Sequence, residues 1–202
     1  MNKEAISDYP LHDLIKRRWS PRAFSKKSVE PEKLRSLLEA ARWAPSSGNE
    51  QPWRFIVTRK DEDEAFELLR ACLNEGNQAW AKNVPVLMLS IAKMFRGDDV
   101  TRPNRTALYD VGLSVGNLVI QATALGLHVH QMGGFDAQKA RQTFQIPAHF
   151  EPIAAIAVGY LGDPAQLDEK LREREIAPRE RKPLRELIFT EKWGESSSII
   201  EK

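Results

Sequence analysis

Residues 106–125 read Thr-Ala-Leu-Tyr-Asp-Val-Gly-Leu-Ser-Val-Gly-Asn-Leu-Val-Ile-Gln-Ala-Thr-Ala-Leu and predict the central helix of the fold. Apolar side chains occupy nearly every face of this helix, and Gly126 follows as a stop signal. A helix that is apolar all round is buried all round. It is therefore covered by a sheet and other helices, or one face lies against a second subunit, where Gly112 and Gly116 permit close approach.

Outward from this helix, the chain alternates between helical and extended patterns. Helices are expected at residues 10–17, 31–43 and 61–73, and strands at 53–58, 84–92, 127–132 and 152–160. The run 84–92 is continuously apolar, which suits a strand buried on both faces. No repeat or Gly/Ser-rich linker divides the chain, so residues 1–202 are expected to form a single domain. The charged, proline-punctuated segment 163–202 is expected to be an extension that wraps back onto the cofactor or a partner subunit.

Composition excludes several classes of partner. The 30 basic and 28 acidic residues give a net charge of +2, which provides no broad field for a nucleic acid. Hydrophobic residues make up 42% of the chain, enough to build a core. No apolar run reaches membrane-spanning length, and residues 1–8 lack the order of a signal peptide. A cytoplasmic protein without nucleic-acid or membrane partners is therefore expected.

Potentially reactive side chains are interpreted as structural. The single cysteine, Cys72, falls on the apolar stripe of a predicted helix. Ser114 matches a Gly-x-Ser-x-Gly pattern but lies mid-helix, where its hydroxyl is expected to bond to the preceding turn. His128 and His130 share a strand face without a third ligand nearby. No catalytic side chain and no metal site are predicted, and neither a Rossmann fingerprint nor a P-loop is present.

Two arginine motifs predict a phosphate site. Residues 18–22 read Arg-Trp-Ser-Pro-Arg, and residues 179–181 read Arg-Glu-Arg. Pro21 pushes Ser20 toward extended backbone, and side chains two apart in an extended segment share a face. Two guanidinium forks and a hydroxyl could then meet one dianion. Each motif alone is more typical of a solvated charged loop.

Two loops carry groups suited to a flat heteroaromatic ligand. Residues 44–53 place Ser46, Ser47 and Asn49 in a turn between a helix and a strand, where short side chains offer fixed hydrogen bonds. At the exit of a strand, Gly133 and Gly134 remove Cβ atoms and permit close approach of the backbone. Taken singly, each loop is explained equally well as an ordinary turn.

In their order and spacing, residues 18–24, 44–53, 132–136 and 179–184 resemble the nitroreductase family of FMN-dependent oxidoreductases. The resemblance covers about residues 12–187. It implies an α+β fold, with a central mixed, mainly antiparallel β-sheet flanked by helices. It also implies an intertwined homodimer with two FMN sites at the subunit interface.

The resemblance also implies which residues bind FMN. Arg22 would lie near the pyrimidine edge and Arg18 nearer the phosphate, and Gly133 or Gly134 would present a backbone amide to the reactive nitrogen. Asn77 matches a family asparagine that bonds the flavin. The full implied set is Arg18, Ser20, Arg22, Arg179 and Arg181 of one subunit, Pro45, Ser46, Ser47 and Asn49 of the partner, and Asn77, Gln131, Met132, Gly133 and Gly134 along the flavin.

The implied activity is a ping-pong cycle in which NAD(P)H reduces FMN and an electron-poor acceptor, such as a nitroaromatic or a quinone, reoxidises it. The cofactor carries the chemistry, so no catalytic side chain is required. Three alternatives remain: an FMN carrier or sensor with little turnover, a specialised reaction such as dehalogenation or flavin fragmentation, and a cofactor-free anion-binding domain. Trp19 and Gly133 depart from the residues that many members carry, and the short segment 93–105 replaces substrate-covering helices of larger members.

Overall fold

A four-stranded antiparallel sheet forms the centre of the computed structural model, which describes residues 3–62 and 64–200. Its strand order is β1-β2-β4-β3, and each neighbouring pair is antiparallel. The strands are β1 (Trp53–Arg59), β2 (Val86–Lys93), β3 (His128–Met132) and β4 (Phe150–Gly159). The expected α+β class with a mainly antiparallel sheet is confirmed, and the strand pairs in the described residues include no parallel one.

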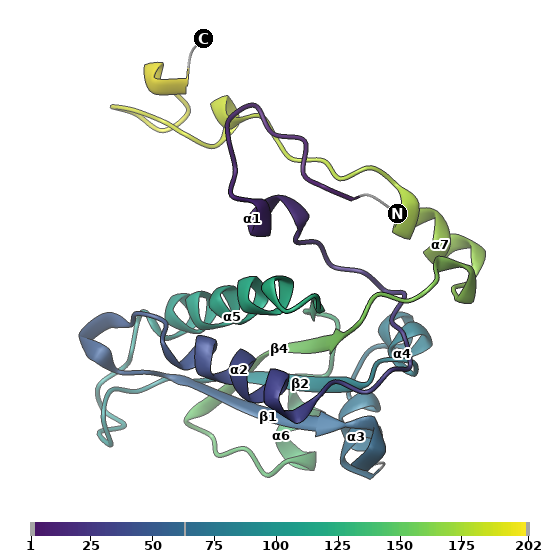
Figure 1. Cartoon of the computed structure of the whole chain (residues 1–202). Coiled ribbons are helices and arrows are strands. Elements are labelled where there is room, and N and C mark those ends of the chain that lie inside the picture. The colour runs from purple at the N-terminus through teal and green to yellow at the C-terminus, as the bar shows by residue number, and fades with distance from the viewer. Residues whose placement is uncertain (1–2, 63, 201–202) are drawn as a thin grey trace.

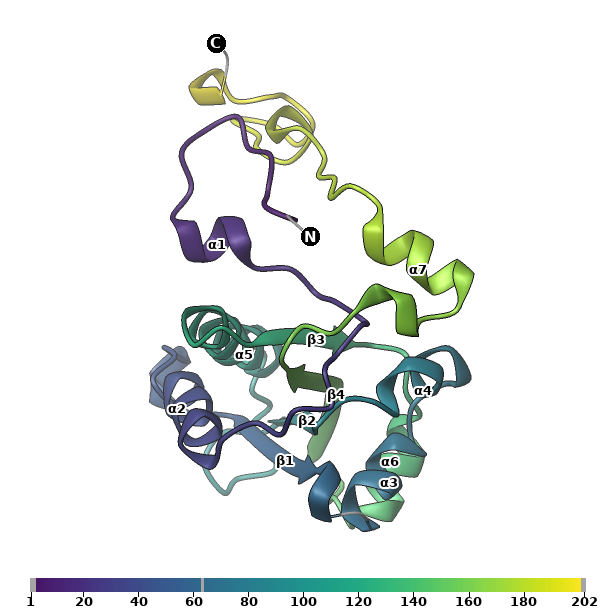
Figure 2. The same cartoon turned by 45° about the vertical axis from the view of Figure 1, so that its right-hand side comes forward.

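Helices cover both faces of this sheet (Figures 1 and 2). The helices are α1 (Asp13–Arg17), α2 (Pro31–Arg42), α3 (Glu64–Arg70), α4 (Glu75–Ala81), α5 (Ala107–Ala124), α6 (Ala137–Thr143) and α7 (Glu169–Ile176). Helices α2 and α5 pack on one face, and α3, α4 and α6 pack on the other. Strand β2 is buried on both sides: Val86 and Met88 face the first layer, whereas Leu87 and Leu89 face the second. The expected buried strand is confirmed.

Helix α5 is buried along one stripe and exposed along the other, so in a single chain it is not buried all round. Its inner stripe, including Val111 and Leu118, is buried against α2 and the sheet. Its outer stripe leaves Leu108 and Tyr109 exposed, with 52% and 69% of their surface accessible. Ser114 is buried, as expected for a structural residue. Its hydroxyl donates to the Ala41 carbonyl of α2 at 2.9 Å, rather than to the preceding turn.

Several boundaries differ from the predicted ones. Helix α1 begins only at Asp13, because the His12 side chain accepts from the Leu14 amide and caps the helix there. The predicted helix 61–73 consists of a 3₁₀ turn at Lys60–Glu62 followed by α3, and residue 63 lies outside the described part. Helices α4, α6 and α7 were not predicted. Each is only two turns long, too short to show a clear apolar period.

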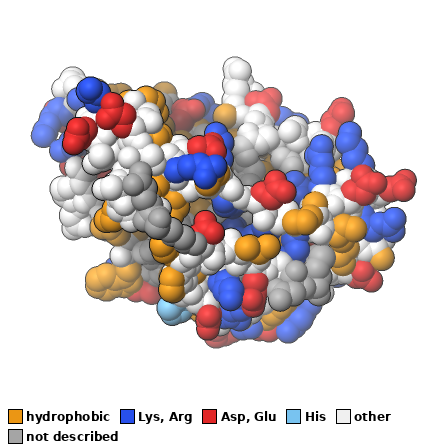
Figure 3. All heavy atoms as spheres, turned by 90° about the horizontal axis from the view of Figure 1, so that it is seen from above, with side chains coloured by type: hydrophobic (Ala, Val, Ile, Leu, Met, Phe, Trp, Pro, Cys, Tyr) orange, Lys and Arg blue, Asp and Glu red, His pale blue; other side chains and the backbone are white. Residues whose placement is uncertain are grey.

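The N-terminal segment 3–12 and the C-terminal segment 177–200 lie side by side, away from the sheet (Figures 1 and 2). Arg179 Nη1 donates to the Lys3 carbonyl at 2.7 Å, and the Tyr9 hydroxyl donates to the Ile200 carbonyl at 3.3 Å. We call this pair of segments the terminal lobe. Viewed from above, the surface of the molecule carries apolar side chains (orange) interspersed among basic (blue) and acidic (red) ones (Figure 3). Within the lobe, Ile6 and Trp193 are almost fully exposed.

Residues 23–24 and 161–162 pair with each other where the chain passes between the core and the terminal lobe. The Gly162 amide donates to the Ala23 carbonyl at 2.8 Å, and Phe24 and Leu161 form an antiparallel bridge. A Cβ at Gly162 would lie 2.5 Å from the Phe24 carbonyl carbon, so only glycine fits this crossing. The start of the 163–200 segment is therefore fixed beside residues 22–24. Within residues 3–62 and 64–200, no helix is both long and apolar enough to cross a membrane.

Candidate functional site

Both arginine motifs line one cavity of about 190 Å³, which we call the arginine cavity. Its wall includes the five expected FMN ligands of these motifs: Arg18, Ser20, Arg22, Arg179 and Arg181. The guanidinium groups come from the segment after α1 and from the segment after α7, near opposite ends of the chain. The folded chain therefore brings together side chains that the sequence separates widely.

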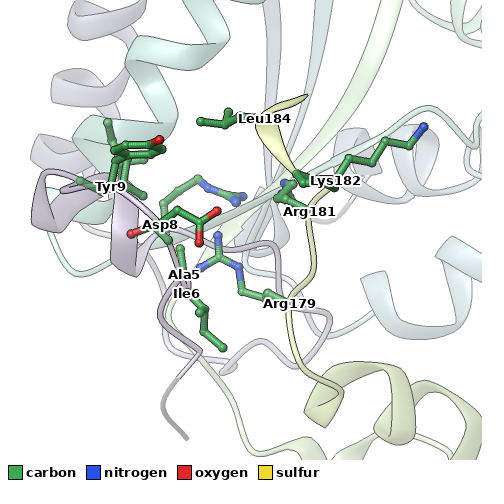
Figure 4. Close-up of a pocket in the computed structure, with 13 residues that line it drawn as sticks. Ala5, Ile6, Asp8, Tyr9, Arg179, Arg181, Lys182 and Leu184 are labelled. Carbon is green, nitrogen blue, oxygen red and sulfur yellow. The ribbon is translucent and has the colours of Figure 1, made fainter. Parts of the chain in front are cut away.

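A larger cavity of about 490 Å³ adjoins the arginine cavity and shares Arg18, Arg179 and Arg181 with it. The terminal lobe forms its other walls. In Figure 4, Arg179 reaches from the C-terminal segment toward Asp8, whereas the side chain of Lys182 points away. This cavity leaves a passage from the arginines toward the exposed side chains of the lobe.

The segment that follows α1 begins with extended backbone at Arg18. Arg18 follows the last turn of α1 with φ −63° and ψ 126°, and its Nη1 donates to Ser20 Oγ at 3.3 Å. The two side chains therefore lie on one face. Trp19 points to the other face, where it is buried edge-on against His128 with 6.0 Å between ring centroids. That packing explains why this position carries an aromatic residue instead of a polar one.

The guanidinium groups in the arginine cavity repel one another. Burial lowers the pKa of Arg18, and the charges of Arg179 and Arg181 lower it further. Burial also lowers the pKa of Arg179, followed by the charge of Arg181. A dianion placed among these groups would relieve the repulsion and accept several charge-assisted hydrogen bonds. The residues present therefore fit a phosphate group.

One acidic residue, Glu175, also lines the arginine cavity, and it is not among the residues predicted from the sequence. Its carboxylate is buried and accepts hydrogen bonds from the backbone amides of Arg22 and Ala23. The residue lies on α7, one turn after Leu171, which packs against the core. That spacing places Glu175 on the same inward face of α7 as Leu171. A glutamate in a helix made mostly of charged residues is, however, ordinarily exposed to solvent.

The turn after β3 is held by α4. The side-chain amide of Asn77 donates to the Gly134 carbonyl at 3.0 Å, and the Asn74 amide donates to the same oxygen at 3.0 Å. A Cβ at Gly134 would lie 2.4 Å from Asn74 Nδ2, whereas Gly133 has nothing within 4 Å of such an atom. Gly134 is thus required for close packing, and Gly133 faces open space. Met132 is buried in the core with 3% of its surface exposed, so its side chain is not free to meet a ligand.

His130 of β3 contacts the backbone of the first arginine motif, residues 18–22. Its Nδ1 lies 2.7 Å from the Pro21 carbonyl, and its ring packs on Trp80 with 4.8 Å between centroids. Burial lowers the pKa of His130 to about 4, with a smaller contribution from the charge of Arg22. The imidazole is therefore neutral near pH 7, and Nδ1–H donates to Pro21. Within residues 3–62 and 64–200, no group of three or more His, Cys, Asp or Glu side chains is placed to hold a metal ion.

The loop 45–49 lies away from the arginine cavity and contributes nothing to its lining. Figure 1 shows the connection between α2 and β1 at the opposite end of the sheet from α4. The Ser46 hydroxyl accepts from the Gln51 amide at 3.0 Å, and Gly48 and Asn49 have left-handed φ angles of 62° and 57°. One copy of the chain therefore leaves Pro45, Ser46, Ser47 and Asn49 apart from the other expected FMN ligands.

Asp110 of α5 anchors this loop. Its buried carboxylate accepts from the Ser47 amide at 3.2 Å and from the Thr106 hydroxyl at 3.1 Å. Replacing it with alanine leaves a buried amide without its acceptor, so we expect Asp110→Ala to lower the free energy of unfolding by about 1–3 kcal/mol. Chemical denaturation measures the change. Asp98→Ala, at an exposed position, serves as the control, and equal stabilities of the two variants would contradict this role for Asp110.

Comparison with known sequences decides the family. The sequence model of the Nitroreductase family matches residues 15–160, well over half of the chain. The chain belongs to the nitroreductase family. Its matched region includes α2, the complete sheet and α5, whereas the arginines at 179 and 181 lie beyond it.

Individual nitroreductase relatives agree with this assignment. A Ralstonia nicotianae protein provisionally named NADH dehydrogenase/NAD(P)H nitroreductase is 33% identical over 133 residues, which are 57% of this chain and 67% of that one. A crystal structure described as an oxidoreductase containing FMN is 38% identical, with a TM-score of 0.88 over 96% of this chain and 97% of that one. A provisionally named nitroreductase from Desulfovibrio desulfuricans, in complex with FMN, is 26% identical, with a TM-score of 0.71 over 93% and 99%. The resemblance drawn from the motifs is confirmed.

Proposed function

We propose that this nitroreductase is an FMN-dependent oxidoreductase that uses NAD(P)H to reduce electron-poor acceptors such as nitroaromatics or quinones. The observation that carries the proposal is the convergence of Arg18, Arg179 and Arg181 in one cavity. Burial, followed by the charges of neighbouring arginines, lowers the pKa of Arg18 and of Arg179, which favours a dianionic ligand at this place. FMN is the cofactor found in two of the solved relatives.

The residues of the chain bind and orient the cofactor. Arg18, Arg179 and Arg181 hold the phosphate, and the Ser20 hydroxyl donates to it. Arg22 places a positive charge near the pyrimidine edge, where it stabilises negative charge on the ring. The bare backbone at Gly133 lets the ring approach closely. When bound, FMN supplies the hydride chemistry, so the absence of an acid–base pair among the proposed ligands is compatible with catalysis.

We further propose that the site is completed in a homodimer, by Pro45, Ser46, Ser47 and Asn49 of the second subunit. Two features support this. The loop 45–49 lies at the other end of the sheet from α4, so these residues reach a flavin beside Gly134 only from another copy (Figure 1). The outer stripe of α5, with Leu108, Tyr109 and the exposed Gly112 and Gly116, is apolar and uncovered.

The decisive experiment for the proposed function is an absorption spectrum of the purified protein, with the released chromophore identified by chromatography. NADPH or NADH is then added, followed by a quinone. Prompt bleaching and reoxidation of bound FMN support the oxidoreductase. A bound flavin that stays oxidised indicates a carrier or sensor instead, and a protein that remains colourless after incubation with FMN contradicts the proposal.

The homodimer is tested at Gly116. A Cβ at this position meets nothing within 4 Å in one copy, so Gly116→Glu leaves the subunit fold intact. In a dimer packed through α5, the buried charge would separate the subunits. Light scattering should report a dimer for the wild type and a monomer with weakened FMN binding for Gly116→Glu. Gln138→Glu, exposed on α6, should remain dimeric, and a wild-type monomer that binds FMN fully would exclude the cross-subunit site.

A further inference from the structure

The carboxylate of Glu175 occupies an unusual place, inside a cavity whose other charged residues are all cationic. Lys3, Arg18, Arg22, Arg174, Arg179 and Arg181 all line that cavity with it. A negative charge there weakens the attraction for a phosphate, so its presence calls for a compensating role. Only 1% of its surface is exposed, and a buried carboxylate persists only where its oxygens are hydrogen-bonded.

Consecutive backbone amides bind the carboxylate. The Arg22 amide lies 3.0 Å from Oε1 and 2.9 Å from Oε2, and the Ala23 amide lies 3.0 Å from Oε1. These bonds fix the backbone at the residue whose side chain lines the arginine cavity. Hydrogen bonds to a charged acceptor are about twice as strong as those between neutral groups. The direction in which Arg22 leaves the backbone is therefore set from α7.

The same bonds also fix the position of the other arginine pair. Helix α7 ends at Ile176, and Arg179 lies four positions after Glu175, a reach of at most about 14 Å. Lys3 donates from Nζ to the Ala177 carbonyl and adds a second tie just after the helix. Within residues 3–62 and 64–200, Arg181 lacks an anchor of this kind, and its Nη1 donates to the neighbouring Glu180 carbonyl at 2.6 Å. Its position relative to Arg18 depends on the anchored end of α7.

We propose that Glu175 is a positioning residue. It holds residues 18–22 and residues 179–181, the two arms of the arginine cavity, in place relative to each other and so enables the protein to recognise the phosphate of its cofactor. The proposal rests on the proposed FMN function. Its consequence is selective: loss of the Glu175 carboxylate separates Arg18 and Ser20 from Arg179 and Arg181 and weakens contacts to the phosphate, while the ring contacts proposed at Gly133 remain. FMN and riboflavin share that ring, and only FMN carries the phosphate, so their relative affinities measure the role of Glu175.

The test compares Glu175→Ala and Glu175→Gln with the wild type, using fluorescence titration of apoprotein with FMN and with riboflavin. We expect Glu175→Ala to raise the Kd for FMN on the order of tenfold, as for loss of charge-assisted hydrogen bonds, and the Kd for riboflavin by about twofold or less. Glu175→Gln keeps the side-chain volume and one acceptor oxygen but turns an amide donor toward the Arg22 N–H. It should therefore give an intermediate loss, also specific to FMN.

Glu173→Ala is the matched control, because Glu173 is exposed on the same helix. It should leave both affinities at wild-type values. Unchanged FMN affinity in both Glu175 variants, or equal weakening of FMN and riboflavin, would overturn the proposal. If Glu175→Ala does not fold, the ratio measured for Glu175→Gln decides. A wild-type protein that binds neither flavin would instead reject the proposed function, so the two failures are distinguishable.

Discussion

Arg181→Ala is expected to raise the Kd for FMN by about 10-fold to 150-fold, equivalent to about 1.5–3 kcal/mol for a hydrogen bond to a charged group. The Arg181 guanidinium lines the arginine cavity and donates only to its neighbouring carbonyl, so little of the fold depends on it. By contrast, Arg179 also donates to the Lys3 and Lys16 carbonyls, and its replacement would disturb the terminal lobe as well. Fluorescence titration of apoprotein with FMN gives the Kd directly.

Lys182→Ala provides the control for this measurement. Lys182 is adjacent in sequence and carries the same charge, but its side chain points away from the neighbouring cavity (Figure 4). Its removal tests whether general positive charge, rather than a placed guanidinium, retains the cofactor. We expect FMN affinity close to wild type for Lys182→Ala. Similar losses in the two variants would mean that Arg181 makes no specific contact with the phosphate.

The second large effect is a loss of stability between pH 6.5 and pH 4, caused by protonation of His130. Burial lowers the pKa of this imidazole from 6.5 to about 4 in the folded protein. The unfolded chain therefore binds the proton more readily across this window. The contribution of the neutral His130 imidazole to the free energy of unfolding is complete above pH 6.5, falls as the pH decreases and is lost below about pH 4. A shift of this size corresponds to about 3 kcal/mol.

Urea denaturation at intervals from pH 7.5 to pH 4 measures this effect. His130→Gln cannot titrate, so its free energy of unfolding should vary less with pH than that of the wild type. His12→Asn removes an exposed histidine while keeping an N-capping side chain, and it should retain the wild-type slope because His130 is still present. Parallel curves for His130→Gln and the wild type would show that His130 does not cause the decline.

Much of the core could be predicted from sequence because its periodicity is strong. The continuous apolar run that became β2 and the apolar helix α5 were found with errors of one or two residues. Pro31 at the first turn of α2 was equally informative. Where one face of an element is buried, the pattern of apolar residues records it directly. The extended arginine motif at residues 18–22 followed from the steric effect of Pro21.

Features that depend on long-range contacts could not be predicted. Glu175 is an ordinary polar residue in α7 until the backbone amides of residues 22 and 23 meet it. Helices α4 and α6 have clear capping residues, Asn74 and Asp136, but too few turns for an apolar period. The side chain of Met132 points into the core, a direction that the strand pattern of five residues did not fix. The expected ligand roles of residues 45–49 remain a prediction.

The arginine cavity draws its guanidinium groups from residues 18–22 and from residues 179–181. During synthesis the chain emerges from the ribosome N-terminus first, and the sheet is complete once β4 has appeared. The second arginine pair emerges later than every strand. A nascent chain can thus form its core well before it can retain a phosphorylated ligand. Under the proposed function, loading of the cofactor is consequently a late event in biogenesis, and we expect a product truncated after β4 to remain an apoprotein.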